Sequence, residues 1–184
     1  MTKHLKTLLL VLVALTFASM KISAESASQF PKRIISLAPS TTEILFALGA
    51  GDRIVGVSRY CDYPSFTTSI AKVGGYVDPN YEKIVALKPD LVVLLTSHRD
   101  AKAELDKMHL KTIMVPHKTV ADIRKAIRLI GDVSGENDKA QALLDEHTNR
   151  TQAILRAVKD KPRPRVLVSI GRDTETGQLA GMYM

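Results

Sequence analysis

Cysteine is almost absent from this sequence of 184 residues, in which Cys61 is the only one. No disulfide can therefore form within the chain. A single cysteine is more often a buried thiol than a reactive one, and we expect this of Cys61. The sequence also lacks internal repeats and low-complexity tracts.

The common catalytic motifs are missing as well. The sequence contains no G-x-S-x-G, no G-x-x-x-x-G-K-[ST], no H-E-x-x-H and no G-x-G-x-x-G, the patterns of several large enzyme classes. We therefore expect a protein that is not an enzyme and has no cofactor of its own. One alternative stays open, an exported α/β hydrolase that uses Ser40, although capping a helix would also account for this serine.

The apolar run near the N-terminus is too short to cross a membrane. It covers residues 8–18, follows Lys3 and Lys6, and precedes the small residues of positions 22–24, whereas a membrane span needs about 20 apolar residues. This order is typical of a cleavable secretory signal over residues 1–24. Because no cysteine follows the run, we expect a soluble protein released into the periplasm, not a lipid-anchored one.

Positive charges slightly outnumber negative charges in the sequence, with 26 Lys and Arg against 19 Asp and Glu. Removal of Lys3, Lys6 and Lys21 with the signal lowers the net charge from +7 to +4. The remaining charges are spread along the chain with no basic cluster beside aromatic residues, so we expect no nucleic-acid partner.

The most informative stretch is residues 33–49, RIISLAPSTTEILFALG. A short apolar run predicts a buried strand that ends at Pro39. Ser40 and Glu43 match the S-x-x-E capping box at the start of a helix, and Gly49 suits the end of that helix. In an open α/β sheet, ligands bind at such turns at the carboxyl ends of strands.

Strands and helices alternate along the rest of the lobe. Strands are predicted over 34–37, 53–58, 91–95 and 111–115, and helices over 41–48, 81–87, 100–108 and 119–133. This spacing indicates βα units and a parallel sheet. We therefore predict an α/β fold, a Rossmann-like ligand-binding lobe over residues 25–135.

A long helix is predicted next. Apolar residues recur at helical spacing over 136–159 without Gly or Pro, and a helix of about 24 residues would span about 36 Å, more than one small lobe needs. Pro162 and Pro164 end it, and a new strand follows over 165–170. We expect a linking helix over 136–160 and the incomplete start of a second lobe over 161–184.

Ligand-facing residues are expected just past the strands, where parallel strands end at one edge. Tyr76 joins this set if the Gly74–Gly75 turn folds toward the same edge, and its ring would suit stacking on a large ring system. Arg59, Thr96, Pro116 and His117 also follow strands. The residues that we assign to ligand binding are Pro39, Ser40, Tyr60, Tyr76, Ser97 and His98.

His98 and His117 lie on different loops without the spacing of metal ligands. Isolated histidines are more often surface or hydrogen-bonded residues, so we expect no metal centre built by this chain.

Three segments in order, RIISLAPSTTEILFALGAGDRIVGVSRYCDYP, VGGY and YEKIVALKPDLVV, resemble the N-terminal lobe of periplasmic binding proteins for vitamin B12, ferric siderophores and haem. The resemblance runs from about Arg33 into the strand at Val166. The VSRYCDYP loop is most similar to the cobalamin-binding members.

This resemblance implies a monomeric, two-lobed solute receptor that holds a large metal chelate between its lobes. Its partner would be the permease of an ABC importer, and the receptor would contact the membrane only through this permease. Residues placed like Ala38–Ser40, Tyr60 and Tyr76 line the cleft of such proteins, and a glutamate placed like Glu82 pairs with an arginine of the permease. Cobalamin is the first expectation for the cargo, with haem or a ferric siderophore as alternatives. Tyr76 and Leu95 stand where the cobalamin receptor has tryptophans, and this sequence has no tryptophan.

Overall fold

The computed structural model describes residues 30–166, 168–172 and 179–183. The expected secretory signal over residues 1–24 lies outside this part. Among the described residues, no helix combines the length and apolar character needed to cross a membrane.

Five parallel strands form one sheet in the order β3-β2-β1-β4-β5. Their bounds are β1 Ile34–Ser36, β2 Ile54–Val57, β3 Ala71–Lys72, β4 Leu91–Leu95 and β5 Thr112–Val115. The predicted α/β class with a parallel sheet is confirmed, although the two-residue strand β3 was not predicted.

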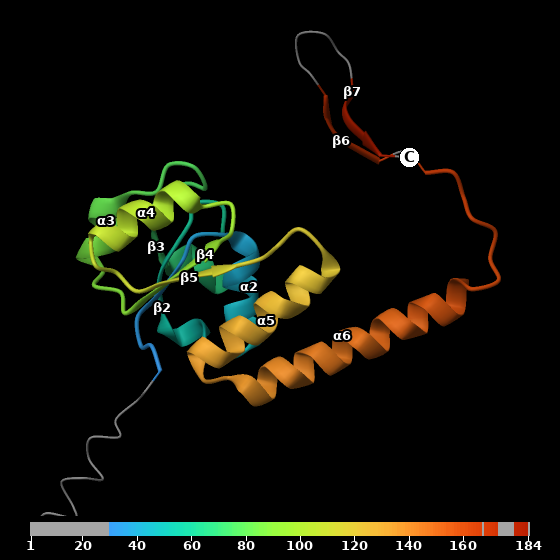
Figure 1. The fold of residues 1–184 in the computed structure, drawn as a ribbon, viewed down its shortest axis with the longest axis horizontal. Helices are drawn as coiled ribbons and strands as arrows, with labels where there is room; N and C mark the ends of the chain where they lie inside the picture. Colours follow the sequence, from blue (N-terminus) through green and yellow to red (C-terminus); the bar gives the residue numbers. More distant parts are fainter. Residues whose placement is uncertain (1–29, 167, 173–178, 184) are drawn as a thin grey trace, which may run out of the picture. The chain divides into compact units, whose positions relative to one another are not determined.

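Helices cover both faces of this sheet. The helical elements are α2 Pro39–Ala47, η1 Gly51–Arg53, η2 Ser65–Ser69, α3 Tyr81–Ala86, α4 Arg99–Lys107, α5 Val120–Ser134 and α6 Asn137–Val158. α3 and α4 lie on one side of the sheet, and α2 and α5 lie on the other (Figure 1). The lobe therefore has three layers.

The two faces of the sheet divide the apolar core by alternation along each strand. Ile34 and Val93 belong to the cluster that packs on α2, α5 and the start of α6. Ile35 and Val92, their neighbours in sequence, belong to the cluster under α3 and α4. All five residues of β4 are buried, as predicted for a strand covered on both sides.

The predicted capping box of Ser40 and Glu43 is wrong. α2 begins at Pro39 with Ala38 as its N-cap, and no side chain caps it. Proline is favoured at the first helical position because its φ angle is already helical and its missing N–H is not needed there. The helix therefore begins before Ser40.

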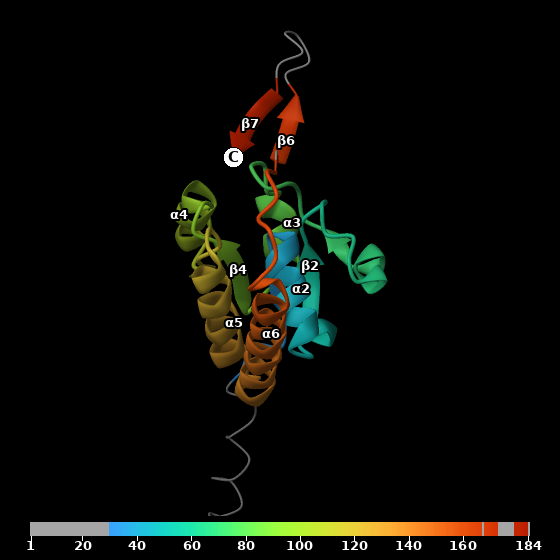
Figure 2. The ribbon, with the colours of Figure 1, turned by 90° about the vertical axis from the view of Figure 1, so that its right-hand side faces the viewer.

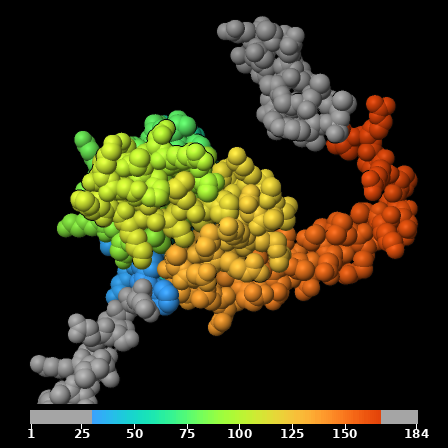
Figure 3. Space-filling view, in the orientation of Figure 1, coloured from blue at the N-terminus to red at the C-terminus, as the bar shows by residue number. Residues whose placement is uncertain are grey.

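A short connection joins α5 to α6. α5 has a true capping box between Thr119 and Asp122, and it ends at Gly135, whose φ of 77° is left-handed. Arg53 clamps the connection from η1, since its guanidinium lies 2.8 Å from a carboxylate oxygen of Glu136 and 2.8 Å from the carbonyl oxygen of Ser134. The surfaces of α5 and the start of α6 are continuous in Figure 3.

The described chain divides into two units, one ending at Asp145 and the other starting at Glu146, with α6 continuous between them. α6 agrees closely with the helix predicted over 136–159. In the second unit, β6 Val168–Arg172 pairs antiparallel with β7 Leu179–Tyr183. The strand predicted over 165–170 thus begins three residues later than expected.

Candidate functional site

The order of the strands places a switch point between β1 and β4. The chain passes from β1 to β2 on one side, and later returns to add β4 and β5 on the other side. At such a point the loops leaving two neighbouring strands diverge and leave a crevice at their carboxyl ends. Here those loops are the turn at Ala38 and Pro39 and the loop of Thr96, Ser97 and His98.

A buried network of hydroxyl groups fixes the turn after β1. Thr42 Oγ1 lies 2.8 Å from Ser36 Oγ and 3.0 Å from the carbonyl oxygen of Ala38. Thr41 Oγ1 lies 2.7 Å from Ser36 Oγ and 2.9 Å from the same carbonyl. These contacts hold the carbonyl that starts α2, and they position Pro39 and the exposed Ser40 at the crevice.

Cys61 extends this network to the loop after β2. Its buried sulfur lies 3.2 Å from Thr42 Oγ1 and 3.2 Å from Ser58 Oγ. The expected buried thiol is confirmed, and it ties the loop that carries Tyr60 to the start of α2.

Tyr76, Ser97 and His98 come together at the same edge of the sheet. The Tyr76 hydroxyl is hydrogen-bonded to Ser97 Oγ, and its ring centroid lies 4.2 Å from that of His98 at an interplanar angle of 65°. The structure therefore brings three of the predicted ligand-binding residues together from two loops.

The turn that delivers Tyr76 depends on Gly74, whose φ of 102° is left-handed. A side chain there would also meet the carbonyl oxygen of Asp78 at 2.5 Å. Arg59 holds the turn from the other side, because its N–H donates to the Gly74 carbonyl at 2.7 Å and its guanidinium pairs with Asp78. The Gly74–Gly75 turn thus folds toward the edge where Tyr76 was expected.

His98 is buried, with 5% of its surface exposed. The backbone N–H of Leu95 donates to His98 Nδ1 at 3.3 Å, whereas Nε2 is buried without a hydrogen-bond partner within the described part of the chain. Burial first, and then the charge of nearby His117, lower the pKa of His98 below its ordinary value.

A cavity of about 470 Å³ lies beside this cluster, between α2, α5 and the ends of β4 and β5. Ser40 lies in its wall, together with Pro116 and His117, which were also expected to face the ligand. The other lining residues are Thr41, Glu43, Ile44, Ala47, Tyr63, Leu95, Val115, Ile123, Ala126 and Leu143. The wall is mostly apolar with a few polar side chains, as is usual for pockets that bind small molecules.

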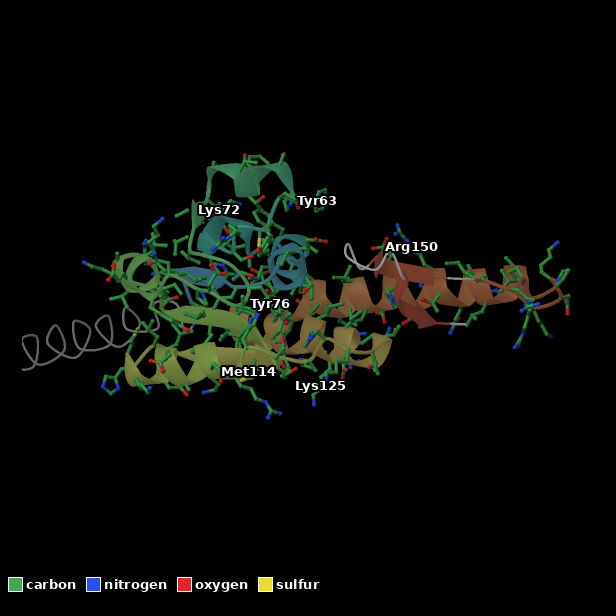
Figure 4. All side chains as sticks on the ribbon, turned by 90° about the horizontal axis from the view of Figure 1, so that it is seen from above. Tyr63, Lys72, Tyr76, Met114, Lys125 and Arg150 are labelled. Atoms are coloured by element: carbon green, nitrogen blue, oxygen red, sulfur yellow. The ribbon has the colours of Figure 1, made fainter. Side chains whose placement is uncertain are left out.

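Tyr60 lies on the loop after β2. It is 57% exposed, and the Arg59 guanidinium lies 6.0 Å from its ring centroid. The segment from Arg59 to Ile70 extends beside β2 at the side of the sheet (Figure 2). Tyr63 of this segment and Tyr76 are labelled in Figure 4 and come from different loops.

Glu82 lies in the first turn of α3 and is exposed, as predicted. Asn80 is the N-cap, and its side-chain oxygen accepts from the Lys83 N–H at 2.9 Å. The carboxylate of Glu82 is therefore free to project from the helix start.

Sequence reasoning missed several residues that line the cavity. Ile123 has the spacing of an apolar helix face, but it is 43% exposed and lines the cavity. Tyr63, three residues after the predicted Tyr60, belongs to no sequence pattern that distinguishes it. Among the described residues, no group of three His, Cys, Asp or Glu side chains is placed to hold a metal ion.

Proteins with similar sequences include substrate-binding proteins of ABC transporters and vitamin B12-binding proteins. A Bacillus subtilis protein named an uncharacterized ABC transporter substrate-binding lipoprotein, YvrC, is 41% identical over 62% of this chain and 38% of its own length. A vitamin B12-binding protein of Vibrio vulnificus is 31% identical over 82% of this chain and 55% of its own length. The chain thus spans about half or less of the length of these relatives.

Solved structures with this fold include the periplasmic vitamin B12 binding protein BtuF of Vibrio cholerae, with a TM-score of 0.69 and 29% identity over 77% of this chain and 56% of that one. The apo form of the periplasmic haem-binding protein RhuT from Roseiflexus has a TM-score of 0.71 and 26% identity over 81% of this chain and 59% of that one.

The family model for periplasmic binding proteins matches residues 34–184, the range that holds the parallel sheet, the crevice at its switch point and the long helix. On these grounds, the chain belongs to the periplasmic binding protein family.

Proposed function

We propose that this chain is part of the substrate-binding component of an ABC importer, and that its cargo is a large metal chelate, cobalamin or a related corrinoid first. The observation that carries the proposal is the group of Tyr76, Ser97 and His98 at the switch point, opposite the turn of Pro39 and Ser40. A flat aromatic ring beside hydrogen-bonding groups suits a planar macrocycle with polar side chains.

The relatives' names support the choice of cargo. Vitamin B12-binding proteins of Vibrio species match this chain over more of its length than the Bacillus subtilis protein does. The proposed location is the periplasm, reached through the signal over residues 1–24, and the proposed partner in the membrane is the permease. We propose a monomer, as the resemblance to such receptors implies.

Titration calorimetry with cyanocobalamin, on the full chain, tests this proposal. Heat that saturates at one ligand per chain is expected. No heat with cyanocobalamin, together with binding of another chelate, would overturn the corrinoid assignment.

A haem receptor is the second candidate, favoured by the likeness to haem-binding RhuT and by the two histidines near the edge. Titration with haemin distinguishes it, because ligation by Tyr or His would give a distinct Soret band. A hydrolase based on Ser40 is the remote alternative, and Ser40 lies in the wall of the cavity. Ester turnover that is lost in Ser40→Ala would revive that alternative.

A further inference from the structure

The Nε2 atom of His98 is a buried polar group that the fold itself does not use. The side chain is 5% exposed, and Nε2 meets no acceptor among the described residues. Folded proteins pair nearly all their buried polar atoms, so an exception calls for an explanation. One explanation is that the partner of this nitrogen arrives with the cargo.

The other ring nitrogen determines what Nε2 can offer. The Leu95 N–H donates to Nδ1 at 3.3 Å, so Nδ1 must keep its lone pair. In a neutral imidazole the hydrogen then resides on Nε2. If Nε2 instead ligated a metal through its own lone pair, the hydrogen would move to Nδ1 and face the Leu95 N–H, setting two donors against each other. The local backbone therefore favours His98 as a hydrogen-bond donor and disfavours it as a metal ligand.

Tyr76 is the aromatic side chain in direct contact with this imidazole, with the ring centroids 4.2 Å apart. A hydrogen bond between its hydroxyl and that of Ser97 holds it, and the backbone that carries it turns at Gly74 and Gly75. Because Nε2 is inaccessible to solvent, a ligand atom can reach it only after a neighbouring group moves. Tyr76 is 36% exposed, and its hydroxyl is hydrogen-bonded to Ser97, so it can move without disturbing the buried core.

We propose that His98 is a specificity-determining donor of the cargo site, that Tyr76 covers it until cargo binds, and that its acceptor is the oxygen of a neutral carboxamide. This inference rests on the proposed binding function. It adds the donor atom, His98 Nε2, the side chain that covers this atom, and the chemical class of the acceptor.

The choice of a neutral acceptor follows from the surroundings of His98. Burial and the charge of His117 lower the pKa of His98 and so favour its uncharged imidazole. A ligand carboxylate bound to Nε2 would therefore be paired with a neutral donor and not with a cation. The guanidinium of Arg59, which holds the Tyr76 turn, is already paired with Asp78. A buried carboxylate without a cation is strongly disfavoured, whereas a carboxamide oxygen needs only a donor. Corrinoids carry carboxamides on their periphery, and haem carries carboxylates.

The first test compares ligands on the full chain by calorimetry. The probes are cyanocobalamin and its monocarboxylic acids, in each of which one side-chain amide is hydrolysed. The wild-type chain should bind at least one of these acids roughly tenfold more weakly than cyanocobalamin, since a lost or mismatched buried hydrogen bond has about this effect. His98→Leu should weaken cyanocobalamin roughly tenfold and abolish that preference, while His98→Gln, which keeps an N–H donor, should stay close to the wild type. His109→Asn, at an exposed histidine after α4, is the matched control and should change nothing.

The outcomes distinguish a failure of the proposed His98 role from a failure of the proposed binding function. If the wild type binds cyanocobalamin and His98→Leu binds it equally well, the role of His98 is wrong and the proposed function stands. If the wild type binds haemin and not cyanocobalamin, both the corrinoid assignment and the carboxamide acceptor are wrong.

A second measurement needs no cargo. Nitrogen-15 NMR of the imidazole in the full chain at pH 7 should show a neutral His98 with its hydrogen on Nε2, and hydrogen on Nδ1 would overturn the proposal. Tyr76→Phe keeps the ring but loses the tie to Ser97, so association with cyanocobalamin should become faster. An unchanged association rate would refute the cover.

Discussion

Cys61 joins two parts of the site through side chains that no solvent reaches. Its sulfur is a hydrogen-bond partner of Thr42 and Ser58. Cys61→Ala leaves the Ser58 hydroxyl buried and deprived of this contact, so the free energy of unfolding should fall by about 1–2 kcal/mol. Urea denaturation checks this, and Cys61→Ser, which keeps a partner atom, is the matched control with a smaller loss. Equal stability of the alanine variant and the wild type would mean that the network contributes nothing.

The burial of His98 predicts a pH dependence of stability. Its pKa is lower in the folded chain than in the unfolded one, where it is about 6.5. The unfolded state therefore binds more protons in the window just below pH 6.5, and stability rises with pH through that window. The stability is fully present above pH 6.5 and is lost as the pH falls through the folded pKa.

Denaturation midpoints measured from pH 7 down to pH 5 check this prediction. His98→Gln should show a shallower decline than the wild type over the same range, because the glutamine side chain does not titrate. Equal slopes for the two proteins would contradict the burial of a neutral imidazole.

Some properties of single residues could be predicted from the sequence, and others could not. Burial of Cys61 and the arrival of Tyr76 at the ligand edge followed from general tendencies and from turn chemistry. The capping box at Ser40 did not, because Pro39 starts the helix first and Ala38 takes the N-cap. The hydroxyl network could not be predicted from the sequence either, since Ser36, Thr42 and Cys61 belong to three segments that only the fold brings together.

At the scale of elements, α5 has the best-defined start in the lobe. The Thr119 hydroxyl accepts from the Asp122 N–H at 3.0 Å, and the Asp122 carboxylate accepts from the Thr119 N–H at 3.1 Å. Thr119→Ala should therefore lower the free energy of unfolding by about 1 kcal/mol, measured by thermal or urea denaturation. Thr119→Ser keeps the hydroxyl and should behave like the wild type. If both variants unfold like the wild type, the cap does not limit stability.

The loops that carry Tyr60 and Tyr76 supply the aromatic surfaces of the proposed site. Tyr60→Ala and Tyr76→Ala should each weaken cargo binding by about 1–3 kcal/mol, the usual range for aromatic anchors. Calorimetry with cyanocobalamin measures the affinity, and thermal unfolding should change little. Phe66→Ala is the control, because Phe66 is an even more exposed aromatic residue but lies on η2, outside the predicted set. A large loss of stability with unchanged affinity would assign the two tyrosines to the core.

Periodicity predicted most elements, and the exceptions have physical reasons. β4 and α6 are long and regular, so an apolar run and a helical repeat without Gly or Pro were enough to place them. β3 has only two residues and owes its existence to pairing with β2 at the edge of the sheet. The apolar part of the cavity wall could not be predicted, since Ile123 and Leu143 share the apolar spacing of core residues and differ only in what faces them.

At the scale of the whole molecule, binding of cargo and delivery to a permease call for different surfaces of the lobe. The crevice lies at the carboxyl ends of β1 and β4, whereas a docking residue has to lie on an exposed outer surface. Glu82 meets that condition, because it is exposed in the first turn of α3. A carboxylate at this position also benefits from the helix dipole by about 0.3–1 kcal/mol. That local benefit alone would explain Glu82 without any partner.

Mutation separates the local role of Glu82 from the proposed docking role. Glu82→Gln should leave cargo affinity and folding nearly unchanged, yet lower stimulation of the transporter's ATPase, because a charge-assisted pair with an arginine of the permease is lost. Glu82→Arg should impair transport further, since it sets like charges against each other, and an acidic replacement of the permease arginine should partly restore uptake. Asp90 is a suitable control, because its carboxylate accepts from the backbone N–H groups of Lys32 and Arg33 and so has a structural partner already. Asp90→Asn should affect stability before it affects transport. Wild-type transport by Glu82→Arg, measured with labelled cyanocobalamin, would reduce Glu82 to a charge that stabilises the start of its helix.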